Sequence, residues 1–195
     1  MPGHNGMILW LTGLPAAGKT TIATLLSERL RAEGARVHVL DGDVIRRING
    51  NLGFSREDRI THLIRVSDTA LSLKEQGVLC IVALIAPYRD NRETIMKKTG
   101  AIEIFVDAPL ETCRKRDPKG LYSRAMRGEI KNFTGIDDPY EPPLTPDIHL
   151  HTERETPEES TRRVLEYLQQ GGYLDFPEEY LAGRPAFLGE AGHDG

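Results

Sequence analysis

The residues best suited to chemistry lie in one glycine-rich segment, 13–20, between an apolar run at 7–11 and a helical pattern that begins at Lys19. Its glycines allow successive backbone N–H groups to turn toward a β-phosphate, and the helix adds the positive end of its dipole. We expect Lys19 to contact the β- and γ-phosphates and the Thr20 hydroxyl to ligate Mg²⁺. The segment predicts a nucleoside triphosphate site rather than a loop that only caps a helix. The predicted ATP-binding residues here are Gly13, Leu14, Pro15, Ala16, Ala17, Gly18, Lys19, Thr20 and Thr21.

Two carboxylates, those of Asp41 and Asp43, follow the next predicted strand, 36–40. Because ligands of parallel sheets bind beyond the carboxyl ends of the strands, we expect both side chains beside the phosphate-binding segment. There a carboxylate holds Mg²⁺, directly or through water, or accepts the proton of an attacking hydroxyl. The sequence leaves open which carboxylate does which, and a turn built on Asp-Gly-Asp is compatible with both roles. We predict Lys19, Asp41 and Asp43 as catalytic residues, and Thr20 and Asp41 as ligands of Mg²⁺.

The remaining motifs favour a small-molecule kinase. The apolar run 78–85 lacks the terminal Asp that a motor ATPase uses for Mg²⁺, and no Asn-Lys-x-Asp guanine-reading motif occurs. Such a kinase needs cations around the transferred phosphoryl group, and a solvated charged face is the alternative for any basic stretch. The candidate for a cationic lid is the segment 111–131, whose basic residues are Arg114, Lys115, Arg116, Lys119, Arg124, Arg127 and Lys131.

A second group of cations and aromatic rings predicts an anionic acceptor. Arginine forks suit phosphate or sulfate oxygens, and an aromatic pair can hold a purine between its rings. Taken singly, each Arg is more often a surface residue and each Phe a core residue. The residues concerned are Arg46, Arg47, Arg56, Arg59, Arg65, Phe54 and Phe133.

Strand and helix patterns alternate along the chain, which predicts an α/β domain of three layers, a central parallel sheet with helices on both faces. Apolar runs predict strands at 7–11, 36–40, 78–85, 102–106 and around 148–150. Helical spacing predicts helices at 19–33, 55–76, 92–98 and 157–170, and one that starts near Pro109.

Length and composition agree with one globular domain. The chain has 195 residues, and we expect a domain at 1–170 and a tail at 171–195, docked through Tyr173, Phe176 and Phe187 or mobile. A formal net charge of −4 argues against a general nucleic-acid surface. The longest apolar stretch, 78–86, is half of what a membrane span needs, and the N-terminus lacks a signal-peptide pattern, so we expect a cytoplasmic protein. We expect Cys80 and Cys113 to be packing residues.

Five blocks of the chain carry a family resemblance. They are Leu-Asp-Gly-Asp at 40–43, Leu-Gly-Phe-Ser at 52–55, Pro-Tyr-Arg at 87–89, Arg-Asp-Pro-Lys-Gly-Leu-Tyr at 116–122 and Asn-Phe-Thr-Gly-Ile-Asp-Asp-Pro-Tyr-Glu at 132–141. Together they resemble the adenylylsulfate (APS) kinase family of P-loop small-molecule kinases. The resemblance covers about 6–170 in one order. It implies a P-loop kinase fold with a mobile basic lid, and transfer of the γ-phosphate of MgATP to the ribose 3′-hydroxyl of adenosine 5′-phosphosulfate (APS). The products would be PAPS and ADP, as in sulfate activation.

Carried over position by position, the resemblance also assigns substrate contacts. Arg116 and Thr152 would lie near the ATP adenine, Arg46 and Arg59 would hold the phosphosulfate, and Phe54 and Phe133 would stack on the APS adenine. The implied APS-binding residues are Asp43, Arg46, Phe54, Arg59, His62, Ile85, Ala86, Lys119, Gly120, Leu121 and Phe133. Relatives are commonly dimers, which implies a homodimer, and a functional association with ATP sulfurylase is a further expectation.

The chain departs from the family pattern at three positions. Ala86 stands where many members have a Ser that is phosphorylated in some relatives, so no phosphoenzyme can form there. His62 and Ile64 stand where the family usually has Asn and Arg, which removes one guanidinium. Two alternatives therefore stay open beside APS phosphorylation: a kinase of another nucleotide-linked anion, and a non-catalytic nucleotide sensor.

Overall fold

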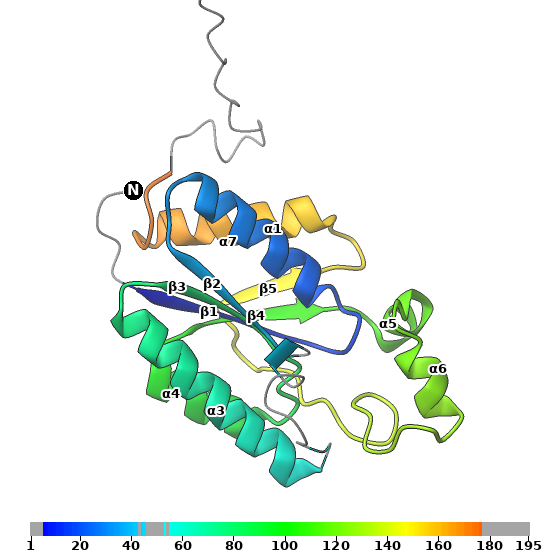
Figure 1. Ribbon diagram of the computed structural model, residues 1–195. Coiled ribbons are helices and arrows are strands. Elements are labelled where there is room, and N and C mark those ends of the chain that lie inside the picture. Colours follow the sequence, from blue (N-terminus) through cyan, green and yellow to red (C-terminus); the bar gives the residue numbers. More distant parts are fainter. Residues whose placement is uncertain (1–5, 43, 46–52, 54, 177–195) are drawn as a thin grey trace, which may run out of the picture.

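The computed structural model describes residues 6–42, 44–45, 53 and 55–176, and its centre is a five-stranded parallel sheet (Figure 1). The strands are β1 (Met7–Thr12), β2 (Val37–Asp41), β3 (Leu79–Ala83), β4 (Ile102–Asp107) and β5 (Ile148–His151), in the order β2-β3-β1-β4-β5. All six residues of β1 are buried, as its central place requires. The predicted parallel α/β sheet is confirmed.

Helices cover both faces of the sheet and make three layers. On one face, α1 (Lys19–Ala32) and α7 (Pro157–Gln170) bury Leu26 and Leu165 against the sheet. On the other, α3 (Arg56–Glu75) and α4 (Arg89–Thr99) bury Val66 and Ile95 beside Trp10 of β1. Two short helices, α5 (Leu110–Arg116) and α6 (Leu121–Met126), lie beyond the carboxyl ends of the strands (Figure 1). The carboxyl edge of the sheet is therefore the place where loops and short helices meet.

Local signals fix the helix starts that the sequence predicts. Ser55 accepts a hydrogen bond from the backbone N–H of Asp58 and so caps α3. At α7, Thr156 and Glu159 form a reciprocal capping box, followed by Pro157 in the first turn. Hydrogen bonds from the Thr156 backbone and side chain hold the pKa of Glu159 below its ordinary value.

Three elements differ from the sequence-based expectation by more than one residue at an end, and tertiary contacts explain two of these differences. α4 begins at Arg89 rather than at 92, because Glu141 accepts a hydrogen bond (2.8 Å) from the Arg89 N–H. The predicted helix near 109 is two helices, because the Asp117 carboxylate accepts the backbone N–H groups of Tyr122 and Ser123 and starts α6. The third strand ends at Ala83, two residues before its expected end, and the chain beyond it borders a cleft.

Packing continues past the last helix. Leu174 and Phe176 are buried in the core on the α1/α7 face, and the Tyr173 ring stacks on Tyr167 with centroids 6.2 Å apart. Phe187 lies outside the described residues. The packed unit therefore reaches at least Phe176.

Within the described part of the chain, no helix is long and apolar enough to span a bilayer.

The two cysteines give a test of how firmly the core is closed. Cys80 in β3 and Cys113 in α5 are both fully buried, and burial raises the pKa of the Cys80 thiol to about 12 and also that of Cys113. Since the thiolate is the reactive form, we expect neither thiol of the folded protein to react with iodoacetamide at pH 8. Mass spectrometry should find both alkylated after unfolding in guanidinium. Labelling of Cys113 in the native protein would show that α5 opens.

Candidate active site

The glycine-rich segment forms a tight loop between β1 and α1, and two of its glycines are required by geometry. Gly13 has φ +153°, and a Cβ there would lie 2.2 Å from the carbonyl oxygen of Val106. Gly18 has φ +109° and occupies the N-cap of α1. The loop therefore approaches β4 closely and leads directly into the helix N-terminus, the arrangement that binds phosphates.

Lys19 reaches back over this loop. Its Nζ donates to the carbonyl oxygens of Gly13 (2.8 Å) and Leu14 (2.7 Å), and the residue is only 9% exposed. The ammonium is thereby held inside the loop rather than free in solvent. A buried, positioned cation at the phosphate-binding loop can stabilise charge on a transferred phosphoryl group.

The pair predicted to hold Mg²⁺ is in contact. Thr20 Oγ1 donates to Asp41 Oδ2 at 2.8 Å, which brings the start of α1 next to the carboxyl end of β2. A hydroxyl and a carboxylate are hard oxygen ligands of the kind that Mg²⁺ prefers. The two residues thus fit a Mg²⁺ site.

One cleft of about 1000 Å³ joins most of the predicted site. This volume lies at the upper end of the range for ligand pockets, and two nucleotides would need a pocket of this size. The predicted residues that line it are Pro15, Ala16, Gly18, Lys19, Thr20, Thr21, Asp41, Arg59, His62, Ile85, Ala86, Arg116, Lys119, Leu121, Phe133 and Thr152. Gly13, Leu14, Ala17 and Gly120 are described but do not border it. Asp43, Arg46, Arg47 and Phe54 lie outside the described residues.

The wall at Phe133 is fixed from three sides. The ring meets Tyr122 edge-on, with centroids 5.0 Å apart and planes at 80°, and Phe133 is 7% exposed. The Asp137 carboxylate accepts the backbone N–H groups of Phe133 (2.6 Å) and Asn132 (2.7 Å), and these bonds lower the pKa of Asp137. Arg59 donates to the Asn132 carbonyl oxygen. The ring is thus presented to the cleft on a preorganised loop.

Arg59 places a positive charge at this end of the cleft. It is 8% exposed, and its Nε lies 3.8 Å from Asp138 Oδ2. The hydroxyl of Tyr88 donates to the other oxygen of Asp138 at 2.9 Å. The guanidinium therefore has a fixed position, which suits an anion-binding role.

Arg116 and Thr152 meet behind the phosphate-binding loop. Thr152 Oγ1 donates to the Ala17 carbonyl oxygen at 2.7 Å, and Arg116 donates to Thr152 through both terminal nitrogens. From the same segment, the Tyr122 hydroxyl donates to the Pro15 carbonyl oxygen at 3.0 Å. The basic segment is therefore attached to the loop at two points.

A buried arginine, Arg92, supports the wall of the cleft at Ala86 and was not predicted from the sequence. Arg92 is 1% exposed and donates to the carbonyl oxygens of Ala86 (2.6 Å) and Glu141 (2.5 Å) and to Glu103 (3.1 Å). Ala86 has φ +44°, a strained value for a residue with a Cβ. Arg92 holds this strained carbonyl in place. The sequence signal was faint, because one arginine in a charged helix has no distinguishing pattern.

Two hydroxyls behind the cleft were also missed. Thr12, the last residue of β1, donates to the Ile85 carbonyl oxygen at 2.7 Å, and its hydroxyl lies 3.0 Å from that of Tyr140. Burial raises the pKa of Tyr140 to about 12, so it stays protonated. Tyr140 belongs to the 132–141 block, and membership in this block is the sequence feature that could have identified it.

The site combines three features: a glycine-rich loop after the central strand β1, a Thr–Asp pair at the end of β2, and a basic segment beside the cleft. Together they define a P-loop kinase of small molecules. The model of the family described as adenylylsulphate kinase matches residues 5–151. The chain belongs to this family.

Similar proteins and solved structures support this family membership. The adenylyl-sulfate kinase of Halothermothrix orenii is 46% identical over 185 residues, which are 94% of this chain and 100% of the relative. The structure of Mycobacterium tuberculosis APS kinase CysC in complex with AMPPNP and APS has a TM-score of 0.81 and 39% identity, and the match covers 86% of this chain and 99% of that one. A hexameric APS kinase from Thiobacillus denitrificans has a TM-score of 0.67 and 30% identity, and the match covers 88% of this chain and 30% of that one.

Proposed function

We propose that this protein transfers the γ-phosphoryl group of ATP to the ribose 3′-hydroxyl of APS and releases PAPS and ADP. The observation that carries the proposal is the single cleft that joins Lys19, Thr20 and Asp41 to Arg59 and Phe133. A phosphoryl donor bound at the first group and a nucleotide acceptor at the second would meet inside one cavity. Membership in the APS kinase family supports APS as that acceptor.

On the donor side, the loop N–H groups and Lys19 hold the phosphates, and Arg116 with Thr152 lies beside the adenine. Thr20 and Asp41 would hold Mg²⁺, which would neutralise phosphate charge. Lys19 stabilises the charge that develops on the transferred group. The phosphoryl group passes to the 3′-oxygen, ADP leaves, and a carboxylate takes the hydroxyl proton.

On the acceptor side, the fixed guanidinium of Arg59 binds the phosphosulfate, and the Phe133 ring stacks on the adenine. Arg46 and Phe54 would complete these contacts, as the sequence predicts. Lys119 borders the cleft from the basic segment, where a lid would close over both substrates.

ADP release measured with a panel of nucleotide acceptors, with and without APS, tests the proposal. We expect saturable, APS-dependent ADP release and a product that carries phosphate on the 3′-oxygen, identified by mass spectrometry and phosphorus NMR. ADP release that ignores APS but responds to another nucleotide anion would contradict it. Nucleotide binding without turnover would point to a sensor instead.

His62 favours keeping another nucleotide-linked anion as the second candidate. Its side chain is 4% exposed and borders the cleft, so the exchange of an amide for an imidazole falls inside the acceptor region. Ile64 is 46% exposed and is not among the lining residues, so the missing guanidinium at that position matters less for the described cleft.

The two carboxylates should respond differently to Mg²⁺. If Asp41 holds the ion and Asp43 accepts the proton, Asp41→Asn and Asp43→Asn both lower kcat, but only the Asp41 variant regains rate as Mg²⁺ is raised. The check is kcat at a series of Mg²⁺ concentrations with ATP and APS saturating. Equal rescue of both variants would overturn this division of roles.

A homodimer, a functional association with ATP sulfurylase, a cytoplasmic location and a role in sulfate assimilation remain parts of the proposal. The hexameric relative supports self-association of some order. Sedimentation velocity of the purified chain, alone and mixed with ATP sulfurylase, tests the first two.

A further inference from the structure

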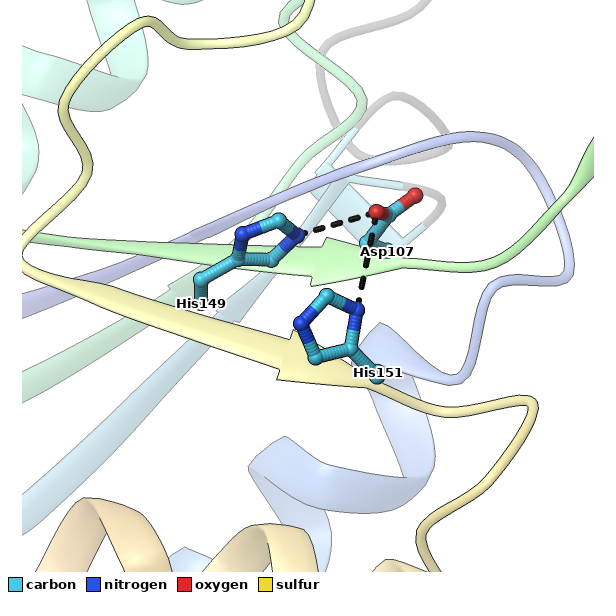
Figure 2. A group of neighbouring side chains, drawn as sticks. All are labelled: Asp107, His149 and His151. Carbon is cyan, nitrogen blue, oxygen red and sulfur yellow. Dashed lines mark hydrogen bonds and ion pairs between the residues drawn. The ribbon is translucent and has the colours of Figure 1, made fainter.

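Three metal-ligating side chains converge at the outer edge of the sheet, on strands β4 and β5 (Figure 2). Asp107 is the last residue of β4, and it pairs with His151, the last residue of β5. His149 precedes His151 by two positions, so both imidazoles leave the same face of the strand. The backbone register itself therefore brings the three side chains together.

The spacing of the ligand atoms fits a small metal ion. Asp107 Oδ2 lies 2.9 Å from His149 Nε2 and 3.9 Å from His151 Nδ1, and all three ligand atoms lie within 4.8 Å of one another. A tetrahedral ion with bonds of about 2.0–2.1 Å has ligand atoms roughly 3.3 Å apart. The two distances to the carboxylate oxygen bracket this value, so small side-chain rotations would close the site.

The first imidazole is held in orientation before any ion arrives. The His149 ring stacks on Phe105 with centroids 4.8 Å apart, and the centroid of the His151 ring lies 4.1 Å from that of His149. The end of β4 is also fixed, since the Asp107 carbonyl oxygen accepts the Thr152 N–H at 2.9 Å. Such support around the ligands is typical of metal sites.

The three side chains are also accessible. They are 36–52% exposed, which admits an ion from solvent and leaves room for a water ligand. A surface hydrogen bond between His149 and Asp107 would explain one of the two short distances. The β4–β5 register brings a second imidazole to 3.9 Å from the same carboxylate oxygen and so supplies the third ligand that a metal site needs.

We propose that Asp107, His149 and His151 bind one divalent transition-metal ion, Zn²⁺ in the first place, with water as the fourth ligand. Two imidazoles and one carboxylate suit this class of ion, whereas Mg²⁺ prefers oxygen ligands in an octahedron. The ion would join the ends of β4 and β5. From there Thr152 reaches the phosphate-binding loop, so the role would be structural and separate from that of the Mg²⁺ in the cleft.

Calorimetric titration of the full chain with Zn²⁺ tests the proposal, after chelator treatment and in excess Mg²⁺ to occupy the oxygen sites of the cleft. We expect one equivalent of Zn²⁺ to bind. Loss of a residue that supports a metal ligand typically lowers metal affinity by roughly 10- to 100-fold, so His149→Ala and His151→Ala should each lower the Zn²⁺ affinity by at least this much. His38→Ala, an exposed histidine on β2, is the matched control and should bind Zn²⁺ like the wild type.

Co²⁺ provides a second readout that does not depend on affinity alone. The wild type should give the visible absorption of a tetrahedral site with nitrogen ligands, and Asp107→Asn, which keeps the shape of the side chain, should lose it. Circular dichroism checks that each variant is folded. Zn²⁺ binding and a Co²⁺ spectrum that are the same in the wild type and in a His149→Ala/His151→Ala variant would overturn the site. Unchanged binding by His151→Ala alone would overturn the three-ligand set.

Discussion

Lys19→Ala is expected to lower kcat by roughly 100-fold or more, the loss seen when a preorganised group that stabilises transition-state charge is removed. The fold should survive, because Lys19 itself lines the cleft and its truncation removes only two hydrogen bonds, those from Nζ to the carbonyl oxygens of Gly13 and Leu14. Loss of such hydrogen bonds costs about 1 kcal/mol. Initial rates of APS-dependent ADP release and the thermal unfolding midpoint measure the two effects separately.

Lys97→Ala is the matched control for this variant. Lys97 is an exposed lysine of α4 and is not among the residues that line the cleft, so its loss should leave kcat unchanged. Turnover at the wild-type rate by Lys19→Ala would refute the assignment of the phosphate-binding loop. A collapse of its unfolding midpoint would mean that the lysine acts mainly in stability.

Arg59→Ala is expected to raise the KM for APS far more than the KM for ATP. A charged contact in a desolvated site is worth about 1.5–3 kcal/mol, or roughly 10- to 100-fold. The structure adds a second reason, because Arg59 also holds the Asn132 carbonyl oxygen next to Phe133, the ring expected to stack on the acceptor. Steady-state kinetics with each substrate varied in turn measures both constants.

Two further variants separate the charge of Arg59 from its support of the loop. Arg59→Lys keeps the positive charge but loses the planar fork, so we expect an intermediate KM for APS. Asp138→Asn removes the carboxylate beside Arg59 and leaves the cation, so its KM for APS should change much less than that of Arg59→Ala. Equal increases in KM for APS and ATP in Arg59→Ala would place the residue outside the acceptor site.

The features that could be predicted from the sequence are those that a local residue pattern determines. The strands follow from apolar runs, α3 from the Ser55 cap, and the phosphate-binding loop from eight consecutive residues. The contact of Thr20 with Asp41 follows from the rule that strand ends meet at one edge. The family resemblance, carried by blocks such as 132–141, was confirmed by the family match.

What could not be predicted depends on partners far apart in the chain. The earlier start of α4 needs Glu141, 52 positions away, and the role of Arg92 depends on a carbonyl oxygen 49 positions away. The strained φ of Ala86 has no sequence signature, since alanine ordinarily avoids that region. The assignments of Asp43, Arg46 and Phe54 stay predictions, because these residues lie outside the described part of the chain.

The support of the Ala86 wall by Arg92 and Glu141 has a consequence for how the protein matures during synthesis. The donor loop is made by one continuous segment, but this wall joins Arg89 and Arg92 to Glu141 and Pro142 across about fifty residues. Such non-local contacts form late, since the loop between them must close first. A chain still lacking residue 142 therefore has the segment of its glycine-rich loop but not all the contacts that hold the cleft wall at Ala86. The glycine-rich loop and the Ala86 wall therefore form one cleft only when the domain is nearly complete.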